Sequence, residues 1–158
     1  MPAAPEPTVF GQAFVFLAAL VGPEPNPTQY VPMSRKLGAL VVYASTGDNK
    51  ECWKAVGAVA AKRRESEHSL VLSQKAAAEL EAGIAKLLPY AMRPGASGLM
   101  YQREIRTHQE SLETSNWQSA RLTKLIAGRK KEERALEQAM DFVKGCRVLA
   151  RRFGVSKP

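Results

Sequence analysis

Apolar side chains recur along this chain in two rows, whose members are alternately three and four residues apart and are interrupted at intervals by polar residues. This spacing places every member of a row on one face of an α-helix and is typical of the contact face of a coiled coil. The pattern predicts two long helices, each with a contact face that we call its seam. The first row is Cys52, Val56, Val59, Arg63, Ser66, Leu70, Ser73, Ala77, Leu80, Ile84 and Leu87, and the second is Ile105, His108, Leu112, Ser115, Ser119, Leu122, Ile126, Arg129, Glu133, Leu136 and Met140.

Capping residues, prolines and glycines indicate where these helices begin and end. Asp48 with Glu51 resembles a capping box, so the first helix is expected over residues 48–92. The segment RPGASG at residues 93–98 supplies a turn, and the absence of proline beyond it predicts a second helix over residues 99–153. At 1.5 Å per residue, the two helices would be roughly 60 Å and roughly 80 Å long.

Two long helices joined by a short turn fold back on each other as an antiparallel hairpin. With the turn centred on residues 95–97, the numbers of facing residues sum to about 192. This register makes most facing positions apolar and also brings polar positions together. The facing pairs include Leu87 with Ile105, Leu70 with Leu122, Ser73 with Ser119, and Arg63 with Arg129.

Shorter elements are expected before the hairpin. Residues 1–8 contain three prolines and should form an arm. Val9–Val21 is apolar around most of a helix, and a proline-rich linker follows it. Ser34 offers an N-cap for a helix over residues 35–45, although Leu37–Ala44 also has the composition of a strand. Such a helix would bury Leu37, Leu40, Val41 and Ala44.

A third apolar row, near the end of the second helix, is turned away from the seam and requires cover. The neutral, apolar residues 9–45 are the natural cover. We therefore predict an all-α fold, a long antiparallel helical hairpin that resembles a coiled coil, with two short N-terminal helices packed on its open end. A single domain (9–158) would follow the arm, with residues 9–47 as its head and 154–158 as a tail. The third row is Phe142, Cys146, Leu149 and Phe153.

We expect no secretion signal, although Val9–Gly22 resembles the apolar part of one. The preceding eight residues carry no Lys or Arg, and a run of 14 residues is shorter than the ~20 that span a membrane. A buried helix is favoured over a segment at a membrane interface. Cys52 and Cys146 form no CxxC pair, which favours free thiols in a reducing intracellular compartment or in a virion.

The chain contains no motif that predicts catalysis. A hydrolase elbow, a phosphate-binding loop and a dinucleotide-binding fingerprint are all missing from the sequence. Of its two histidines, His108 falls on the seam and His68 lies in the polar segment ESEHS, so a core imidazole and a solvated one are expected. A metal site would have to recruit scattered carboxylates. We expect no enzymatic activity, no cofactor and no metal.

Positive charge is the feature that points to a partner. The net charge is +8 and the pI is near 9.7, and residues 93–158 carry fourteen cations against seven acids. One row of the second helix lies opposite the seam, and a second group lies towards its end. We interpret them as a surface for nucleic acid or an acidic partner. The alternatives are a solvated helix face with one stray aromatic side chain, and cations favoured at a helix C-terminus by the macrodipole. The row is Trp117, Arg121, Lys124 and Lys131, and the group is Lys144, Arg147, Arg151 and Arg152.

The charged run at residues 129–134 does not form one patch on a helix. Arg129 and Glu133 are expected on the seam, Lys130 and Arg134 on a flank, and only Lys131 in the row that contains Trp117.

These observations predict a non-enzymatic, basic helical component of a larger assembly that contacts nucleic acid through the second long helix. A small subunit of a nucleoprotein particle, or an accessory of DNA packaging or replication, would be of this type. The alternative is a purely protein-binding scaffold subunit of a multi-subunit complex or virion, without nucleic-acid contact. A role at a membrane surface through Val9–Val21 ranks third, and self-association is compatible with each.

Overall fold

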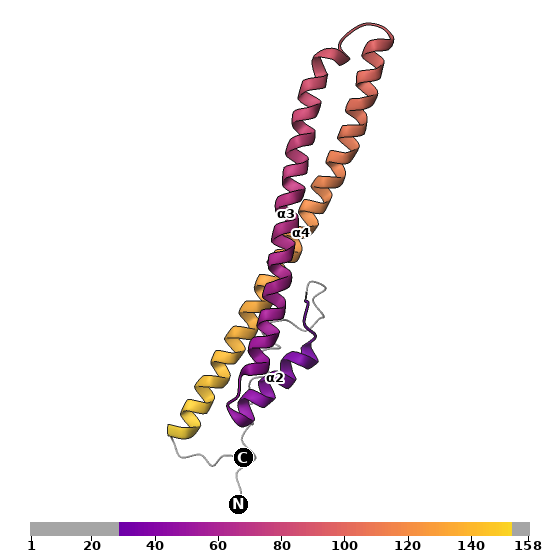
Figure 1. Ribbon diagram of the computed structural model, residues 1–158. Helices are drawn as coiled ribbons and strands as arrows, with labels where there is room; N and C mark the ends of the chain where they lie inside the picture. Colours follow the sequence, from indigo (N-terminus) through magenta and orange to yellow (C-terminus); the bar gives the residue numbers. More distant parts are fainter. Residues whose placement is uncertain (1–28, 153–158) are drawn as a thin grey trace, which may run out of the picture. The chain divides into compact units, whose positions relative to one another are not determined.

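The computed structural model describes residues 29–152, which form three α-helices and no strand (Figure 1). Helix α2 comprises Met33–Thr46, α3 comprises Lys50–Ala91, and α4 comprises Ala96–Arg152. The expectation of an all-α fold is confirmed. The expected helix Val9–Val21 and the last member of the third apolar row, Phe153, lie outside the described residues.

The start of α3 is capped from one side only. The Lys50 amide donates a hydrogen bond to Oδ1 of Asp48 at 3.0 Å, which satisfies a donor that the helix leaves unpaired. Glu51 does not return the bond as a capping box requires, because its carboxylate pairs with Lys54 at 3.1 Å. The Asp48 amide donates instead to the hydroxyl of Thr46.

The turn between α3 and α4 is tighter than expected. Pro89 is accommodated inside the last part of α3, and α4 begins at Ala96 rather than at residue 99. Gly95 adopts the left-handed conformation, with φ of 81°, which a residue without a Cβ adopts at little cost. A Cβ at Gly98 would collide with the carbonyl oxygen of Arg93, so glycine is required at both positions.

Helix α2 resolves the choice between helix and strand, but it differs from the expectation in two respects. It begins at Met33 after Pro32, without a side-chain cap, so the assignment of Ser34 as its N-cap is wrong. Its buried face also differs by about one residue from the expected one, since Val41 is 37% exposed. The reason is an ion pair that draws a lysine into the interior. The buried residues of α2 are Lys36, Ala39, Leu40 and Tyr43.

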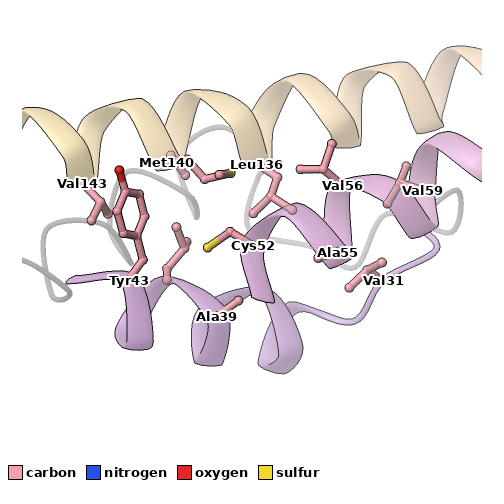
Figure 2. Close-up of a cluster of buried hydrophobic side chains, with 12 residues drawn as sticks. Val31, Ala39, Tyr43, Cys52, Ala55, Val56, Val59, Leu136, Met140 and Val143 are labelled. Carbon is pink, nitrogen blue, oxygen red and sulfur yellow. The ribbon is translucent and has the colours of Figure 1, made fainter. Parts of the chain in front are cut away.

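The chain divides into two units, to which both long helices contribute. Unit 1 contains the residues up to Arg63 and those from Ala127 onwards, and unit 2 is Arg64–Ile126. The core of unit 1 is built by α2, α3 and α4 together (Figure 2). Its buried members are Val31, Ala39, Leu40, Tyr43, Cys52, Ala55, Val56, Val59, Leu136, Ala139, Met140 and Val143.

The third apolar row is only partly covered in unit 1. Phe142 is partly buried and packs against the core, and Cys146 is half-buried. Leu149, however, is 51% exposed. Within the described residues, the expected cover therefore reaches only the first part of this row, because the core residues of α4 lie between Leu136 and Val143.

A buried ion pair lies inside unit 1. Nζ of Lys36 lies 3.0 Å from Oε1 of Glu132, and the two side chains are 0% and 1% exposed. The same carboxylate accepts hydrogen bonds from the backbone amides of Tyr30 (2.7 Å) and Val31 (2.8 Å). One side chain of α4 thus holds both α2 and the segment that enters it.

Unit 2 contains the middle of both seams. The Ser73 and Ser119 hydroxyls lie 2.9 Å apart, and the Ser73 hydroxyl also donates to the carbonyl of Ser115 at 3.0 Å. Nearer the turn, the rings of Tyr90 and Tyr101 lie 5.2 Å apart. Every member of the two sequence rows, in both units, is buried or half-buried. The helical faces expected from the spacing are therefore the faces that the two long helices turn inwards.

Glu132→Gln should destabilise the protein by about 3–5 kcal/mol, because it leaves the Lys36 charge buried without a counter-charge. Urea unfolding followed by circular dichroism measures this loss. Glu137→Gln is the matched control, since Glu137 is an exposed acid on the same helix, and it should change the free energy of unfolding by less than about 0.5 kcal/mol. Similar unfolding midpoints for the two variants would contradict a stabilising role for the pair.

Candidate functional site

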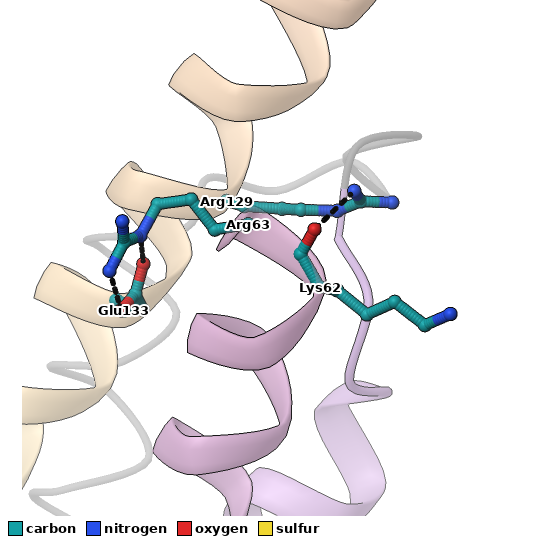
Figure 3. Close-up of polar contacts among 4 residues, drawn as sticks. All are labelled: Lys62, Arg63, Arg129 and Glu133. Atoms are coloured by element: carbon teal, nitrogen blue, oxygen red, sulfur yellow. Dashed lines mark hydrogen bonds and ion pairs between the residues drawn. The ribbon is translucent and has the colours of Figure 1, made fainter. Parts of the chain in front are cut away.

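The structure separates the charges of the run at residues 129–134. Glu132 is buried against Lys36, and Glu133 is half-buried against Arg63 (Figure 3). The Arg63 guanidinium donates to both carboxylate oxygens of Glu133, with Nε–Oε2 at 2.6 Å and Nη2–Oε1 at 3.3 Å. Two-point pairing of this kind is the strong geometry for an arginine and a carboxylate. Both acids of the run are therefore used inside unit 1.

Arg63 and Arg129, which the register of the sequence places opposite each other, each bind another partner. Arg63 contacts Glu133, one turn further along α4, because opposite charges attract where two guanidinium groups would repel. Arg129 donates instead to the carbonyl oxygen of Lys62 at 3.2 Å (Figure 3). Its guanidinium also lies 6.0 Å from the centre of the Tyr30 ring, and Nζ of Lys62 lies 5.6 Å from the same centre. Within unit 1, the polar layer of the seam thus contains an ion pair between α3 and α4.

The cations of α4 in unit 1 mostly face solvent. Among residues 127–152, six cations are exposed but only two acids are. The sequence of this segment contains eight cations and four acids. The exposed side chains therefore carry the same excess of positive charge as the whole segment, but only half of its acids. The exposed acids, Glu137 and Asp141, separate two basic groups. We call Lys130, Lys131 and Arg134 the first basic group, and Lys144, Arg151 and Arg152 the second basic group.

Arg147 has a structural role that the sequence did not indicate. Its guanidinium donates to the carbonyl oxygen of Ala44 at 2.6 Å and contacts that of Tyr43 at 3.4 Å. These carbonyls lie in the last turn of α2, where a cation is favoured by the macrodipole. The carbonyl of Tyr43 also accepts a hydrogen bond from the Gly47 amide at 2.9 Å. Within unit 1, Arg147 therefore connects α2 to α4. Its guanidinium binds backbone oxygens instead of the nucleic acid or acidic partner that the sequence led us to expect.

Trp117 is the exposed aromatic residue that the sequence singled out in unit 2. Its side chain is 62% exposed, and the guanidinium of Arg121 lies 5.7 Å from its ring centre. Lys124, one turn further along α4, is also exposed. Trp117 and Arg121 thus form a stacked aromatic and cationic pair at the surface. Another exposed tryptophan, Trp53, lies on α3 in unit 1 and is 52% exposed.

An open groove of about 610 Å³ lies between α3 and α4 in unit 2, and the sequence rows did not reveal it. We call it the seam groove. The groove is lined by residues of the seam and by residues on the flank of each helix. Small residues among them leave space between longer apolar side chains. Its lining includes Leu72, Ser73 and Ala76 of α3, and Gln118, Arg121 and Leu125 of α4.

Residues 29–152 contain neither a candidate metal site nor a candidate membrane-spanning helix. No three His, Cys, Asp or Glu side chains in this range are grouped so that they could hold a metal ion. None of its helices combines the length and the apolar composition that crossing a membrane requires. No protein-family model, curated protein or solved structure matches the chain. The charges and shapes of the described side chains are therefore the basis for assigning a function.

Burial also controls the reactivity of the two free thiols. Burial raises the pKa of the Cys52 thiol from its ordinary 9.0 to about 11, and the neighbouring carboxylates of Asp48 and Glu51 act in the same direction. Burial raises the pKa of Cys146 as well, but this residue is only half-buried. Since the thiolate is the reactive form, Cys52 should be the less reactive thiol in the folded protein.

At about pH 8, a chromogenic disulfide reagent should label Cys146 before Cys52, and urea should make both react at once. Unfolded Cys52 loses its proton at a lower pH than folded Cys52. The free energy of unfolding should therefore fall as the pH rises from 9.0 towards about 11. Cys52→Ser should reduce this fall, and Cys146→Ser should retain it together with the slow labelling phase. Fast labelling of Cys52 in folded Cys146→Ser would contradict the assignment.

Proposed function

We propose that the protein is a non-enzymatic, basic helical component of a larger assembly and that it contacts nucleic acid through α4. The observation that carries this proposal is the separation of charge along α4 in unit 1. The acids Glu132 and Glu133 are used in interior ion pairs, while both basic groups face solvent. A phosphate backbone approaching this helix would meet mainly ammonium and guanidinium groups.

The chemistry of such a surface favours contact with phosphates over reading of bases. Lysine and arginine on a helix neutralise phosphates and release bound counterions, and this contribution does not depend on base sequence. The exposed Trp117 with its stacked Arg121 adds a flat surface on which an unpaired base can stack. We therefore propose contact with nucleic acid of any sequence, with an additional preference for single strands at the tryptophan.

The same proposal includes the arrangement of the three helices. An antiparallel, coiled-coil-like hairpin with α2 fastened to its open end would give an assembly component two stiff helices. The contacts that support it are Ser73 with Ser119 in unit 2 and Arg63 with Glu133 in unit 1. Arg147, bound to the last carbonyls of α2, supports the fastening of α2.

The seam groove supports a second candidate function, that of a protein-binding scaffold without nucleic-acid contact. The groove exposes apolar surface, including Leu72, which is 54% exposed. Open apolar surface of this kind is typical of protein contacts. The two candidates differ in their dependence on salt, because only phosphate contacts weaken steeply as ions are added.

Neutralising the second basic group should weaken nucleic-acid binding and its dependence on salt. The triple variant Lys144→Gln, Arg151→Gln and Arg152→Gln should reduce the salt slope by about 2–3, roughly one for each phosphate that is no longer neutralised. Fluorescence anisotropy with labelled oligonucleotides, between ~50 and ~200 mM salt, measures both effects.

A matched triple variant serves as the control for this experiment. Lys75→Gln, Lys86→Gln and Arg103→Gln remove the same charge from exposed positions in unit 2, and they should leave the slope nearly unchanged. An equal effect of the two triple variants would show that only net charge matters. If the wild-type chain binds neither single- nor double-stranded oligonucleotides at low salt, the proposal fails and the scaffold function is favoured.

Trp117→Ala should weaken binding of a single-stranded oligonucleotide by about tenfold, since stacking of one base on an aromatic ring contributes about 1–3 kcal/mol. Binding of a duplex should change little, because its bases are already stacked. Trp53→Ala is the matched control, as this tryptophan is similarly exposed but has no place in the proposed surface. Equal effects of the two substitutions, or equal effects on single and double strands, would contradict base stacking at Trp117.

A further inference from the structure

Unit 2 buries few of its apolar side chains. The buried apolar residues in Arg64–Ile126 are Ala77, Ala91, Ile105 and Ile126. The seam leucines are only half-buried, and the apolar side chains of Val71 and Leu72 are 60% and 54% exposed. Two helices alone cannot enclose the side chains between them, so the shortage of cover extends along the seam.

The seam groove is the part of unit 2 where incompletely covered apolar side chains border an open space. Ser73 and Ala76 on one side and Gln118 on the other leave space between the leucines. The hydroxyl of Ser73 is already used in bonds to Ser115 and Ser119. The surface that lines the groove is mainly apolar, so apolar side chains from outside fit it better than polar ones.

Charge separates this surface from the proposed nucleic-acid surface. The sequence of unit 2 contains eight cations and seven acids, whereas that of unit 1 contains fifteen cations and eight acids. Among the side chains that line the groove, Arg121 alone is charged. The phosphates of a nucleic acid would meet a single positive charge in the groove. Two copies of unit 2, in contrast, can approach each other with almost no net repulsion.

The size of the face suits a partner of the same length. Residues 64–91 of α3 rise about 42 Å, and two packed helices present a face about 20 Å wide. Such a face would cover roughly 800 Å² on each partner, which is the size of a standard stable interface. A second copy supplies helices of this length, and its own half-buried leucines are covered in the same contact.

From these observations we propose that the seam groove of unit 2 binds the seam groove of a second copy of the chain, which forms a twofold dimer with four helices in contact. The same surface then serves on both partners, as twofold symmetry requires. Leu72 of α3 and Leu125 of α4 enter the space that the small residues of the other copy leave open. This dimer does not depend on the two basic groups of unit 1, although Arg121 belongs both to the groove and to the proposed stacking site at Trp117.

The test is the oligomeric state of the purified full-length chain, at a salt concentration high enough to suppress phosphate contacts. Sedimentation velocity and light scattering over a series of protein concentrations should give the mass of a dimer. Leu72→Glu and Leu125→Glu should each raise the dissociation constant of the dimer at least about tenfold, since each places a charge in the centre of the contact. Both helices line the groove, so both variants should have this effect.

Val71→Glu is the matched control, because Val71 is as exposed as Leu72 on the same helix but does not line the groove. It should leave the dissociation constant unchanged. Circular dichroism verifies that each variant keeps the helicity of the wild type, and Ala76→Arg replaces any that does not. A monomer up to about 100 μM, a dimer that persists in the groove variants, or an equal weakening in Val71→Glu would overturn the proposal.

Discussion

The buried ion pair between Lys36 and Glu132 is the constraint on which the arrangement of unit 1 depends. A lysine and a glutamate are costly to remove from water, so each is stable inside only while the other stays in place. Glu132 also accepts the amides of Tyr30 and Val31, so a single carboxylate determines how α2 is oriented and how the chain enters it.

The same pair links the fold to the proposed function. A helix segment with alternating charges would present acids and bases equally to a partner. Here Glu132 and Glu133 turn inwards to Lys36 and Arg63, and their neighbours Lys130, Lys131 and Arg134 remain at the surface. Under the proposed function, stability and recognition would use different residues of one charged stretch. Arg129 of this stretch, and Arg147 further along α4, are held by backbone carbonyls.

The sequence predicted the parts of the fold that depend on periodicity. The rows of three and four residues identified the inward faces of α3 and α4, because a helix repeats its faces regularly. The buried face of α2 was not predictable in this way, since a lysine is rarely buried unless it is paired and the partner of Lys36 lies almost a hundred residues away in the chain. The partners of Arg63 and Arg147 and the seam groove were missed for the same reason. They depend on which residues meet across helices, and the spacing within one helix does not contain this information.

The hydroxyl pair of Ser73 and Ser119 has a consequence for how the two helices of unit 2 can vary in length. If one helix slid past the other by seven residues, Ser73 would face Leu112 or Ile126 and its hydroxyl would lose its partner. An insertion or deletion in one helix alone therefore brings unlike layers together, whereas matched changes of seven residues in both helices preserve the order of the layers. The serine pair thus favours one register of the two helices within unit 2.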